Sequence, residues 1–245
     1  MTQFKIKVAG YVAAVAAMYD SSRAYCRDYL CEEPADFSVE ITAVDLALEQ
    51  QKHEKTCNAE GRDVTPVPNE QLELTAIQRK IAEGLFAYDA LIFHSSAVAV
   101  DGVAYLFTAK SGTGKSTHTR LWRQMFGDRA VMVNDDKPFL RMSSNGVMVY
   151  GSPWNGKHRL GSNICVPLKA ICVLERGEVN EIVPIAPEEA LSMLLQQSNR
   201  PTRPSLLPKY LELLDKLAGG TVFYRLRCNM DSEAALVAYQ AMSRE

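Results

Sequence analysis

The sequence predicts an α/β fold, because short apolar runs of strand length alternate with segments whose apolar residues recur at helical spacing. Asp-Gly at 101–102 and Asn-Gly at 145–146 each separate two apolar runs, which is a strong hairpin signal because these residues tolerate positive φ. A length of 245 residues fits one α/β domain with a smaller leading subdomain. We expect the subdomain at residues 1–68 and the main domain at residues 69–245.

The leading subdomain is expected to contain a strand at residues 4–8, a helix between residues 19 and 30, and a strand at residues 38–44. The apolar run at residues 8–19 follows two lysines and has the outline of a signal peptide. However, the run is rich in alanine and short, so we favour a core strand followed by a helix. Residues 51–68 are polar, with one glycine and two prolines, and predict a loop or joint.

The main domain is expected to begin with an amphipathic helix at residues 72–88, followed by a strand ending in a histidine at residues 90–94. The remaining elements are expected on the same grounds, namely short apolar runs for strands and apolar residues at helical spacing for helices. They are a hairpin at 97–100 and 103–108, a helix from about residue 115, a strand at 130–134, a hairpin at 139–142 and 147–150, strands at 168–175 and 221–227, and helices at 187–197, 206–217 and 232–242.

Composition and charge exclude several classes of partner. The 27 basic and 29 acidic residues give a formal charge of −2, too balanced to attract nucleic acid or an anionic membrane surface. The six cysteines form no C-x-x-C pair and no zinc-type spacing with histidines, which is typical of reduced thiols. We therefore expect a cytoplasmic protein without nucleic-acid or membrane partners.

The segment at residues 109–116 reads A-K-S-G-T-G-K-S and has the context of a phosphate-binding loop, with an apolar strand before it and a helix after it. In such a loop, backbone N–H groups and the helix dipole converge on phosphate oxygens. Lys115 would reach the terminal phosphates, and the Ser116 hydroxyl would coordinate Mg²⁺. The expected ligands are ATP and Mg²⁺, and the expected cofactor-binding residues are Ser111, Gly112, Thr113, Gly114, Lys115, Ser116 and Thr117.

Ala109 occupies the position at which the G-x-x-x-x-G-K-[ST] pattern has its first glycine. The effect of this alanine depends on the backbone conformation at residue 109. A methyl group is tolerated if residue 109 has an ordinary extended conformation, and the loop is strained if it has positive φ.

Asp135 and Asp136 follow the strand at residues 130–134, so a central sheet would present them at the same edge as the phosphate loop. One carboxylate is suited to hold Mg²⁺, and the other to accept a proton from an attacking hydroxyl. The alternative is a solvated turn before Pro138.

His94 taken alone is typical of a core histidine, although its place at a strand end would also let it face the phosphates. The segment at residues 151–159 combines turn formers with Trp154, Lys157 and Arg159, which suits an anionic or hydroxylated substrate. An exposed loop anchored by the tryptophan is an equal alternative.

The stretch from His94 to Leu140 resembles the catalytic domain of HPr kinase/phosphorylase, which has a histidine, a β-hairpin, an S-G-x-G-K-S loop, a helix and a strand closing with paired aspartates in this order. S-P-W-N-G-K at 152–157 and the run at 167–177 are similar to the shorter HPr-kinase-like proteins of bacteria. The resemblance implies the phosphoenolpyruvate-carboxykinase-like P-loop fold, with a mixed sheet and a hairpin ahead of the loop. It also implies catalytic roles for His94, Lys115, Asp135 and Asp136, with Ser116 and Asp136 at the metal, and a homo-oligomer.

These observations favour an ATP- and Mg²⁺-dependent kinase that phosphorylates a hydroxyl of a small molecule. A protein serine is the alternative acceptor. A nucleotide-dependent carboxykinase and a non-catalytic nucleotide sensor are alternatives of other classes. ATP, GTP and pyrophosphate all remain open as the phosphoryl donor.

Overall fold

The computed structural model describes residues 1–110 and 112–244. The chain divides into two compact units, Met1–Gly84 and Leu85–Glu245, which are described separately. The helix at Asn69–Leu85 belongs almost wholly to the first unit, although its sequence predicts the start of the main domain at residue 69.

The first unit is a three-stranded sheet with helices, in which β1 pairs antiparallel with β2 and β2 pairs parallel with β3. The expected strand at 4–8 and the expected helix after residue 19 are both present. The elements are β1 (Thr2–Val8), β2 (Tyr11–Ala17), α1 (Asp20–Tyr25), η1 (Arg27–Tyr29), β3 (Phe37–Glu40), α2 (Ala43–Ala59) and α3 (Asn69–Leu85).

The apolar run at residues 8–19 differs from the expected strand and helix. A tight turn at Ala9 and Gly10, which both have positive φ, folds the run back as strand β2 along β1. The helix begins only after the run, at Asp20. Alanine has a high helix propensity, but pairing with β1 overrides it here.

Helix α2 is the main element that the sequence analysis missed, because it occupies residues expected as the end of a strand and the start of a loop. A capping box starts the helix: Thr42 and Asp45 each bond the backbone N–H of the other residue. The helix is then fixed by ion pairs rather than by an apolar stripe. Arg79 of α3 lies 3.1 Å from Asp45 and 2.5 Å from Glu49, and all three side chains are nearly buried.

Glu73 of α3 is fully buried and caps the start of α1. Its carboxylate accepts hydrogen bonds from the backbone N–H groups of Met18 (2.5 Å) and Tyr19 (3.1 Å) and from Ser22 Oγ (2.5 Å).

We expect Glu73→Gln to lower the free energy of unfolding by about 2–3 kcal/mol, because the amide NH₂ would face backbone donors. Chemical denaturation measures this loss. Glu70→Gln, on the exposed first turn of the same helix, is the control and should change stability by less than about 0.5 kcal/mol.

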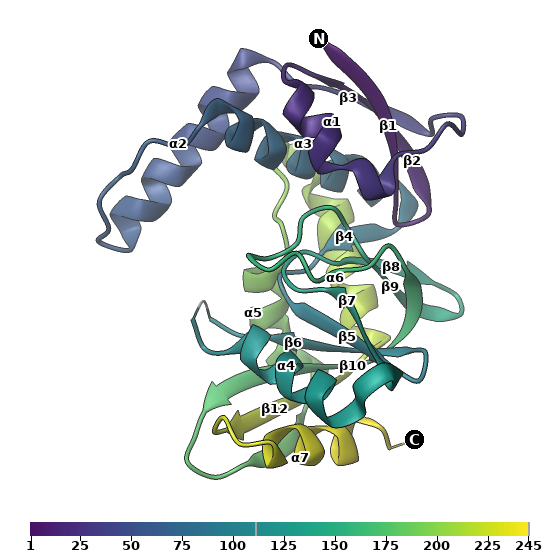
Figure 1. Cartoon of the computed structure of the whole chain (residues 1–245), viewed down its shortest axis with the longest axis vertical. Coiled ribbons are helices and arrows are strands. Elements are labelled where there is room, and N and C mark those ends of the chain that lie inside the picture. The colour runs from purple at the N-terminus through teal and green to yellow at the C-terminus, as the bar shows by residue number, and fades with distance from the viewer. Residues whose placement is uncertain (111, 245) are drawn as a thin grey trace. The chain divides into compact units, whose positions relative to one another are not determined.

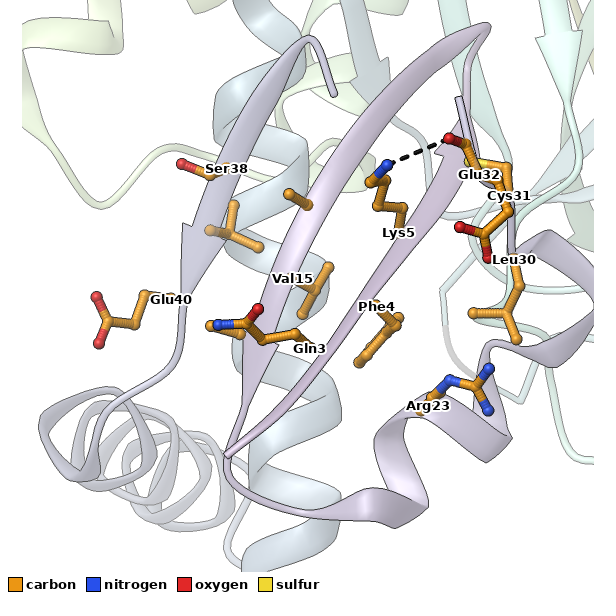
Figure 2. Close-up of a pocket in the computed structure, with 13 residues that line it drawn as sticks. Gln3, Phe4, Lys5, Val15, Arg23, Leu30, Cys31, Glu32, Ser38 and Glu40 are labelled. Carbon is orange, nitrogen blue, oxygen red and sulfur yellow. Dashed lines mark hydrogen bonds between the residues drawn. The ribbon is translucent and has the colours of Figure 1, made fainter. Parts of the chain in front are cut away.

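The exposed face of the three-stranded sheet is hollowed (Figure 2). Cross-strand pairing sets Lys5, Ala14 and Ser38 in one row, so the floor at the centre of this face carries only a small side chain. The resulting cavity measures about 460 Å³, and Lys5 Nζ donates to the carbonyl of Glu32 (3.2 Å) at its rim.

The second unit is built on a nine-stranded mixed sheet in the described residues, with the order β4-β8-β9-β10-β6-β5-β7 and with β12 and β11 added beside β10. The long strand β10 bends the sheet, since its first part pairs with β9 and its second part lies between β6 and β12. The elements are η2 (Phe86–Tyr88), β4 (Ala90–Ile92), β5 (Ser96–Val100), β6 (Val103–Thr108), α4 (Lys115–Phe126), η3 (Gly127–Arg129), β7 (Ala130–Asn134), β8 (Phe139–Ser143), β9 (Gly146–Tyr150), β10 (Cys165–Arg176), β11 (Glu181–Ile185), α5 (Pro187–Gln197), η4 (Pro204–Leu206), α6 (Leu207–Gly219), β12 (Val222–Cys228) and α7 (Glu233–Met242).

Four strands of this sheet end at the same edge. Strands β6, β10 and β12 run parallel to one another. Strand β5 is antiparallel to both β6 and β7, so β7 also runs parallel to β6. The segments that follow β7, β6, β10 and β12 therefore emerge at one edge of the sheet.

Helices cover both faces of this part of the sheet. Tyr105 and Phe107 of β6 pack in a cluster with α4 and α7, whereas Ala104 and Leu106 pack in a second cluster with α5 and α6. Figure 1 shows α4 beside α7, in agreement with the contacts between them. Because both faces are covered, β6 is apolar at nearly every position.

Both predicted hairpins and the five predicted helices of the main domain are present, and the α/β class with a mixed sheet is confirmed. Strand β11 is missed because its composition, with Glu181 and Pro184, is unlike a strand; it pairs at the edge of the sheet, where proline is tolerated. Within the described residues, we find no helix of sufficient length and apolar character to span a membrane.

Candidate functional site

The predicted phosphate loop connects the end of β6 at Thr108 to the start of α4 at Lys115. Gly112 and Gly114 have φ values of 75° and 124°, a region in which a side chain would strain the backbone. The glycines therefore allow the sharp turn that leads the chain into the helix. Of the expected loop residues, Ser111 lies outside the described residues.

Ala109 does not have the positive φ that would strain the loop, so its backbone conformation tolerates the methyl group. Positive φ occurs among the described non-glycine residues at Ala9, Asp89, Asp101 and Arg159, so Ala109 is not among them. Ala109 is 4% exposed and belongs to the apolar cluster beneath α4. The replacement of glycine therefore contributes apolar contact rather than strain.

Lys115 lies half-buried at the first turn of α4, and its Nζ donates to the carbonyl of Ala109 (3.3 Å). Burial lowers the pKa of the ammonium, the charge of Asp136 opposes this shift, and the charge of Lys137 adds to it. Ser116 is exposed on the same turn and Thr117 is half-exposed. The loop thus brings a desolvated cation and two hydroxyl groups to the carboxyl end of β6.

Asn134, the last residue of β7, builds the turn that carries both aspartates. It is fully buried. Its Oδ1 accepts hydrogen bonds from the N–H groups of Asp136 (2.8 Å) and Lys137 (2.7 Å), and its Nδ2 donates to the carbonyl (3.1 Å) and hydroxyl (3.0 Å) oxygens of Ser152. Ser152 Oγ in turn donates to the Lys137 carbonyl (2.6 Å), so the turn is held from both sides.

We expect Asn134→Ala to lower the free energy of unfolding by about 2–4 kcal/mol, because it leaves the partly buried N–H groups of Asp136 and Lys137 without their acceptor. Urea denaturation measures the change, and Asn145→Ala is the control because Asn145 is exposed in the β8–β9 turn. An Asn134→Ala protein as stable as the control would show that the turn does not depend on this side chain.

Asp136 and His94 form a pair at this edge, with Asp136 Oδ1 3.2 Å from His94 Nε2. The backbone of His94 is fixed by its N–H bond to the Gln197 carbonyl (2.6 Å) and by the Thr108 hydroxyl, which donates to its carbonyl (2.9 Å). Burial disfavours the charged form of Asp136, but the hydrogen bond from His94 and the nearby lysines outweigh it. The pKa of Asp136 is therefore lowered. The structure thus brings three of the four predicted catalytic residues, His94, Asp136 and Lys115, to one place.

Asp135 faces the neighbouring segment instead. It is 6% exposed, and its Oδ1 accepts a hydrogen bond from the Gly156 N–H (2.5 Å). Burial raises the pKa of Asp135, although the Gly156 hydrogen bond acts in the opposite direction. A Cβ on Gly156 would lie 2.9 Å from Asp135 Oδ2, so the glycine allows this close approach. The two aspartates therefore have different surroundings and opposite pKa shifts.

The predicted substrate residues divide into an anchor and an exposed rim. Trp154 is 6% exposed and packs edge-on against Phe139, with ring centroids 6.3 Å apart. Lys157 and Arg159 are exposed in the turn that follows, on the chain segment that contacts Asp135 through Gly156. The tryptophan thus fixes the base of a segment whose cationic side chains reach solvent.

The oxygen donors at this edge fit a nucleotide with Mg²⁺. The Ser116 hydroxyl and the Asp136 carboxylate are the hard ligands that Mg²⁺ prefers. Throughout the described residues there is no group of three or more His, Cys, Asp or Glu side chains placed to hold a metal ion. A Mg²⁺ ion bound here would therefore take most of its ligands from phosphate oxygens and water, as is usual for nucleotide sites.

Sequence reasoning missed three residues at this edge: Asn134, Ser152 and Arg176. Arg176, at the end of β10, donates through Nη2 to the carbonyl of Gly112 in the phosphate loop (2.7 Å). A signal was available for Asn134, because a polar residue ending an apolar strand next to two aspartates is suited to form an Asx turn. Ser152 and Arg176 are distant in sequence from the residues that they contact, so no local pattern reveals them.

A family model for the SynChlorMet cassette protein ScmC matches residues 62–216 of the chain. The chain belongs to the ScmC family. The matched range contains the phosphate loop, the His94–Asp136 pair and the segment at 151–159. The ScmC match ends within α6, so β12 and α7 lie beyond it.

No curated protein matches this ScmC family member. Among solved structures, it is similar to the Hpr(Ser) kinase/phosphatase from Coxiella burnetii, with 12% sequence identity over 62% of this chain and 94% of that chain. The TM-score is 0.36, which is too low to establish a shared fold.

Proposed function

We propose that the chain is a kinase that transfers the γ-phosphoryl group of ATP, with Mg²⁺, to a hydroxyl group of a small molecule. One observation carries the proposal: the phosphate loop with Lys115 and the Asp136–His94 pair lie at the same edge of one sheet. The order of these motifs resembles HPr kinase, and with it we propose the phosphoenolpyruvate-carboxykinase-like P-loop arrangement. Transfer of a phosphoryl group needs positioning and charge stabilisation more than covalent chemistry, and this edge supplies both.

The surroundings of each residue suggest its role. Lys115 and the loop N–H groups would hold the terminal phosphates and stabilise the charge on the transferring group. Asp136 lies beside Lys115 and His94 and its pKa is lowered, so it would stay ionised and hold Mg²⁺ together with Ser116. His94 would orient Asp136 through the Nε2–Oδ1 contact of 3.2 Å.

Asp135 would act as the base that receives the acceptor's proton. A carboxylate with a raised pKa is the stronger base of the two, and a pair of carboxyl groups with diverging surroundings is typical of divided acid and base roles. The acceptor oxygen would attack the γ-phosphorus and the bond to the β-phosphate oxygen would break. ADP leaves, and the acceptor proton passes to Asp135.

The acceptor would enter on the side of the segment at 151–159, which adjoins Asp135 through Gly156. Exposed Lys157 and Arg159 suit an acceptor that carries an anionic group. A serine of a protein or peptide is the alternative acceptor, since it offers the same hydroxyl chemistry.

The test is transfer of label from γ-³²P-ATP with Mg²⁺ into a bacterial extract separated into small molecules and proteins. The wild-type protein should label small molecules, and Lys115→Ala should not. Label in a single protein band would replace the small-molecule acceptor with a protein serine. Identical labelling by wild type and variant would contradict the kinase, and turnover that requires oxaloacetate would favour a carboxykinase. Tight ATP binding without any transfer would favour a sensor.

A further inference from the structure

We propose that a cavity at the carboxyl ends of β6, β10 and β12 binds the purine base and ribose of the phosphoryl donor. The donor is then a nucleoside triphosphate and not pyrophosphate or another inorganic polyphosphate. This inference rests on the proposed function, because it places the base and ribose of the ATP that is proposed to bind at the same site.

The cavity measures about 460 Å³, within the range of about 300–1,000 Å³ that is usual for small-molecule sites. It adjoins the phosphate loop directly, since Gly112, Thr113 and Gly114 form part of its wall. The first turns of α4 supply another wall, and the segments that follow β10 and β12 close it. The residues that line it are Gly112, Thr113, Gly114, Thr117, His118, Leu121, Leu174, Glu175, Arg176, Gly177, Cys228, Asn229 and Met230.

The strand order places this cavity where the rest of a nucleotide must lie. Strand β6 lies between β5 and β10, and the Asp136–His94 pair follows β7 beyond β5. The cavity is on the other side of the phosphate loop, at the ends of β10 and β12. A triphosphate held by the loop would thus have its reacting end toward Asp136 and its nucleoside end toward the cavity. In parallel sheets, ligands bind beyond the carboxyl ends of the strands, as they would here.

The walls suit an aromatic base. Leu121 and Leu174 are nearly buried, and Met230 is 77% exposed at the rim. A base between them would cover the methionine side chain, which the protein alone leaves in water. Arg176 connects this wall to the loop through its hydrogen bond to the Gly112 carbonyl, so the cavity and the loop are fixed to each other.

His118 provides the polar group that a base would need. The residue is 3% exposed and is among those that line the cavity. The Trp122 indole N–H, which can only donate, is bonded to His118 Nε2 (3.0 Å), so the neutral ring carries its proton on Nδ1. Among the described residues this buried Nδ1–H has no hydrogen-bond partner. Buried donors without partners are rare in native proteins, and a ring nitrogen of a purine would complete this one.

The first experiment compares binding of MgATP, Mg-tripolyphosphate and Mg-pyrophosphate by isothermal titration calorimetry. MgATP should bind at least about ten-fold more tightly than tripolyphosphate, because the base adds buried apolar contact. Equal affinity would overturn the inference, because the base would then add nothing to binding, while the loop could still hold ATP for phosphoryl transfer. A preference for ATP without any phosphoryl transfer would support the cavity and contradict the proposed function. Failure of all three to bind would contradict both.

The second experiment tests the cavity wall. Met230→Ala should weaken MgATP binding about three- to ten-fold and leave tripolyphosphate binding unchanged, since only the base would contact this side chain. The substitution is at an exposed residue, so the protein should fold. Met125→Ala is the matched control, because Met125 is also exposed but does not line the cavity. If both substitutions weakened MgATP binding equally, or if neither weakened it, the base would have to bind elsewhere.

The third experiment tests His118 by changing first the ligand and then the protein. Analogues of ATP that lack ring nitrogen N1, N3 or N7 are compared with ATP in binding. Loss of one particular nitrogen should weaken binding about three- to ten-fold, the value of one hydrogen bond. In His118→Phe the same analogue should bind as well as ATP does. Equal affinity of all analogues for the wild-type protein would exclude His118 Nδ1 as the donor.

Discussion

Lys115→Ala is expected to reduce phosphoryl transfer about 10²–10³-fold while the protein remains folded. The ammonium is the cation that the loop offers to the transferring group, and loss of one such preorganised charge typically costs two to three orders of magnitude. Stability should be unchanged or slightly higher, because burial disfavours the charge of Lys115 in the protein without nucleotide. Initial rates with γ-³²P-ATP and thermal unfolding together separate the two effects.

Lys110→Ala is the matched control for this prediction. Lys110 belongs to the same loop but its side chain is exposed, so its removal should change the rate by less than about three-fold. Comparable losses in the two variants would mean that the loop responds to total charge rather than to a positioned ammonium. A fully active Lys115→Ala protein would remove the basis of the kinase assignment.

Asp136→Asn is expected to lower kcat/KM by about 10²–10³-fold and to raise the Mg²⁺ concentration needed for half-maximal activity. The amide oxygen can still accept the hydrogen bond from His94 Nε2, so the fold of the turn should persist. What is lost is the negative charge that would hold the metal. Rates measured over a Mg²⁺ titration show whether the loss lies in metal binding.

Asp128→Asn provides the control, since Asp128 is exposed at the other end of β7 and should behave as the wild type. Asp135→Asn gives the contrast: it should lower kcat without raising the Mg²⁺ requirement, because Asp135 would act on the acceptor. If Asp136→Asn left the Mg²⁺ requirement unchanged and Asp135→Asn raised it, the two roles would have to be exchanged.

Helix α2 and strand β2 of the first unit were predicted wrongly from sequence for the same reason: contacts with other elements determine both. Helix α2 is held by ion pairs of its own Asp45 and Glu49 with Arg79, which comes from a helix some thirty residues further along the chain. Its apolar pattern is weak because ion pairs attach this helix to its neighbour, a role that a stripe of apolar residues usually has. In the run that forms β2, the alanines favour a helix locally, but pairing with β1 overrides this preference.

The predicted site residues lie in short segments, and this is why most of them could be found. The phosphate loop, the aspartate pair and the Asp-Gly hairpin each depend on neighbouring residues, so their patterns are visible locally. The different surroundings of Asp135 and Asp136 could not be foreseen. Gly156 contacts the first and His94 the second, and both contacts join distant parts of the chain.

By itself, the sequence determined the order of strands, turns and helices around the phosphate loop, because backbone preferences and apolar periodicity are local properties. Only the tertiary structure decided which side chains meet. Parallel pairing of β6, β10 and β12 sets the cavity beside the loop, and pairing of β5 with β6 and β7 sets Asp136 on its other side. The physical reason is that burial, hydrogen bonds and charge pairs depend on distance in space, which the pairing of strands determines.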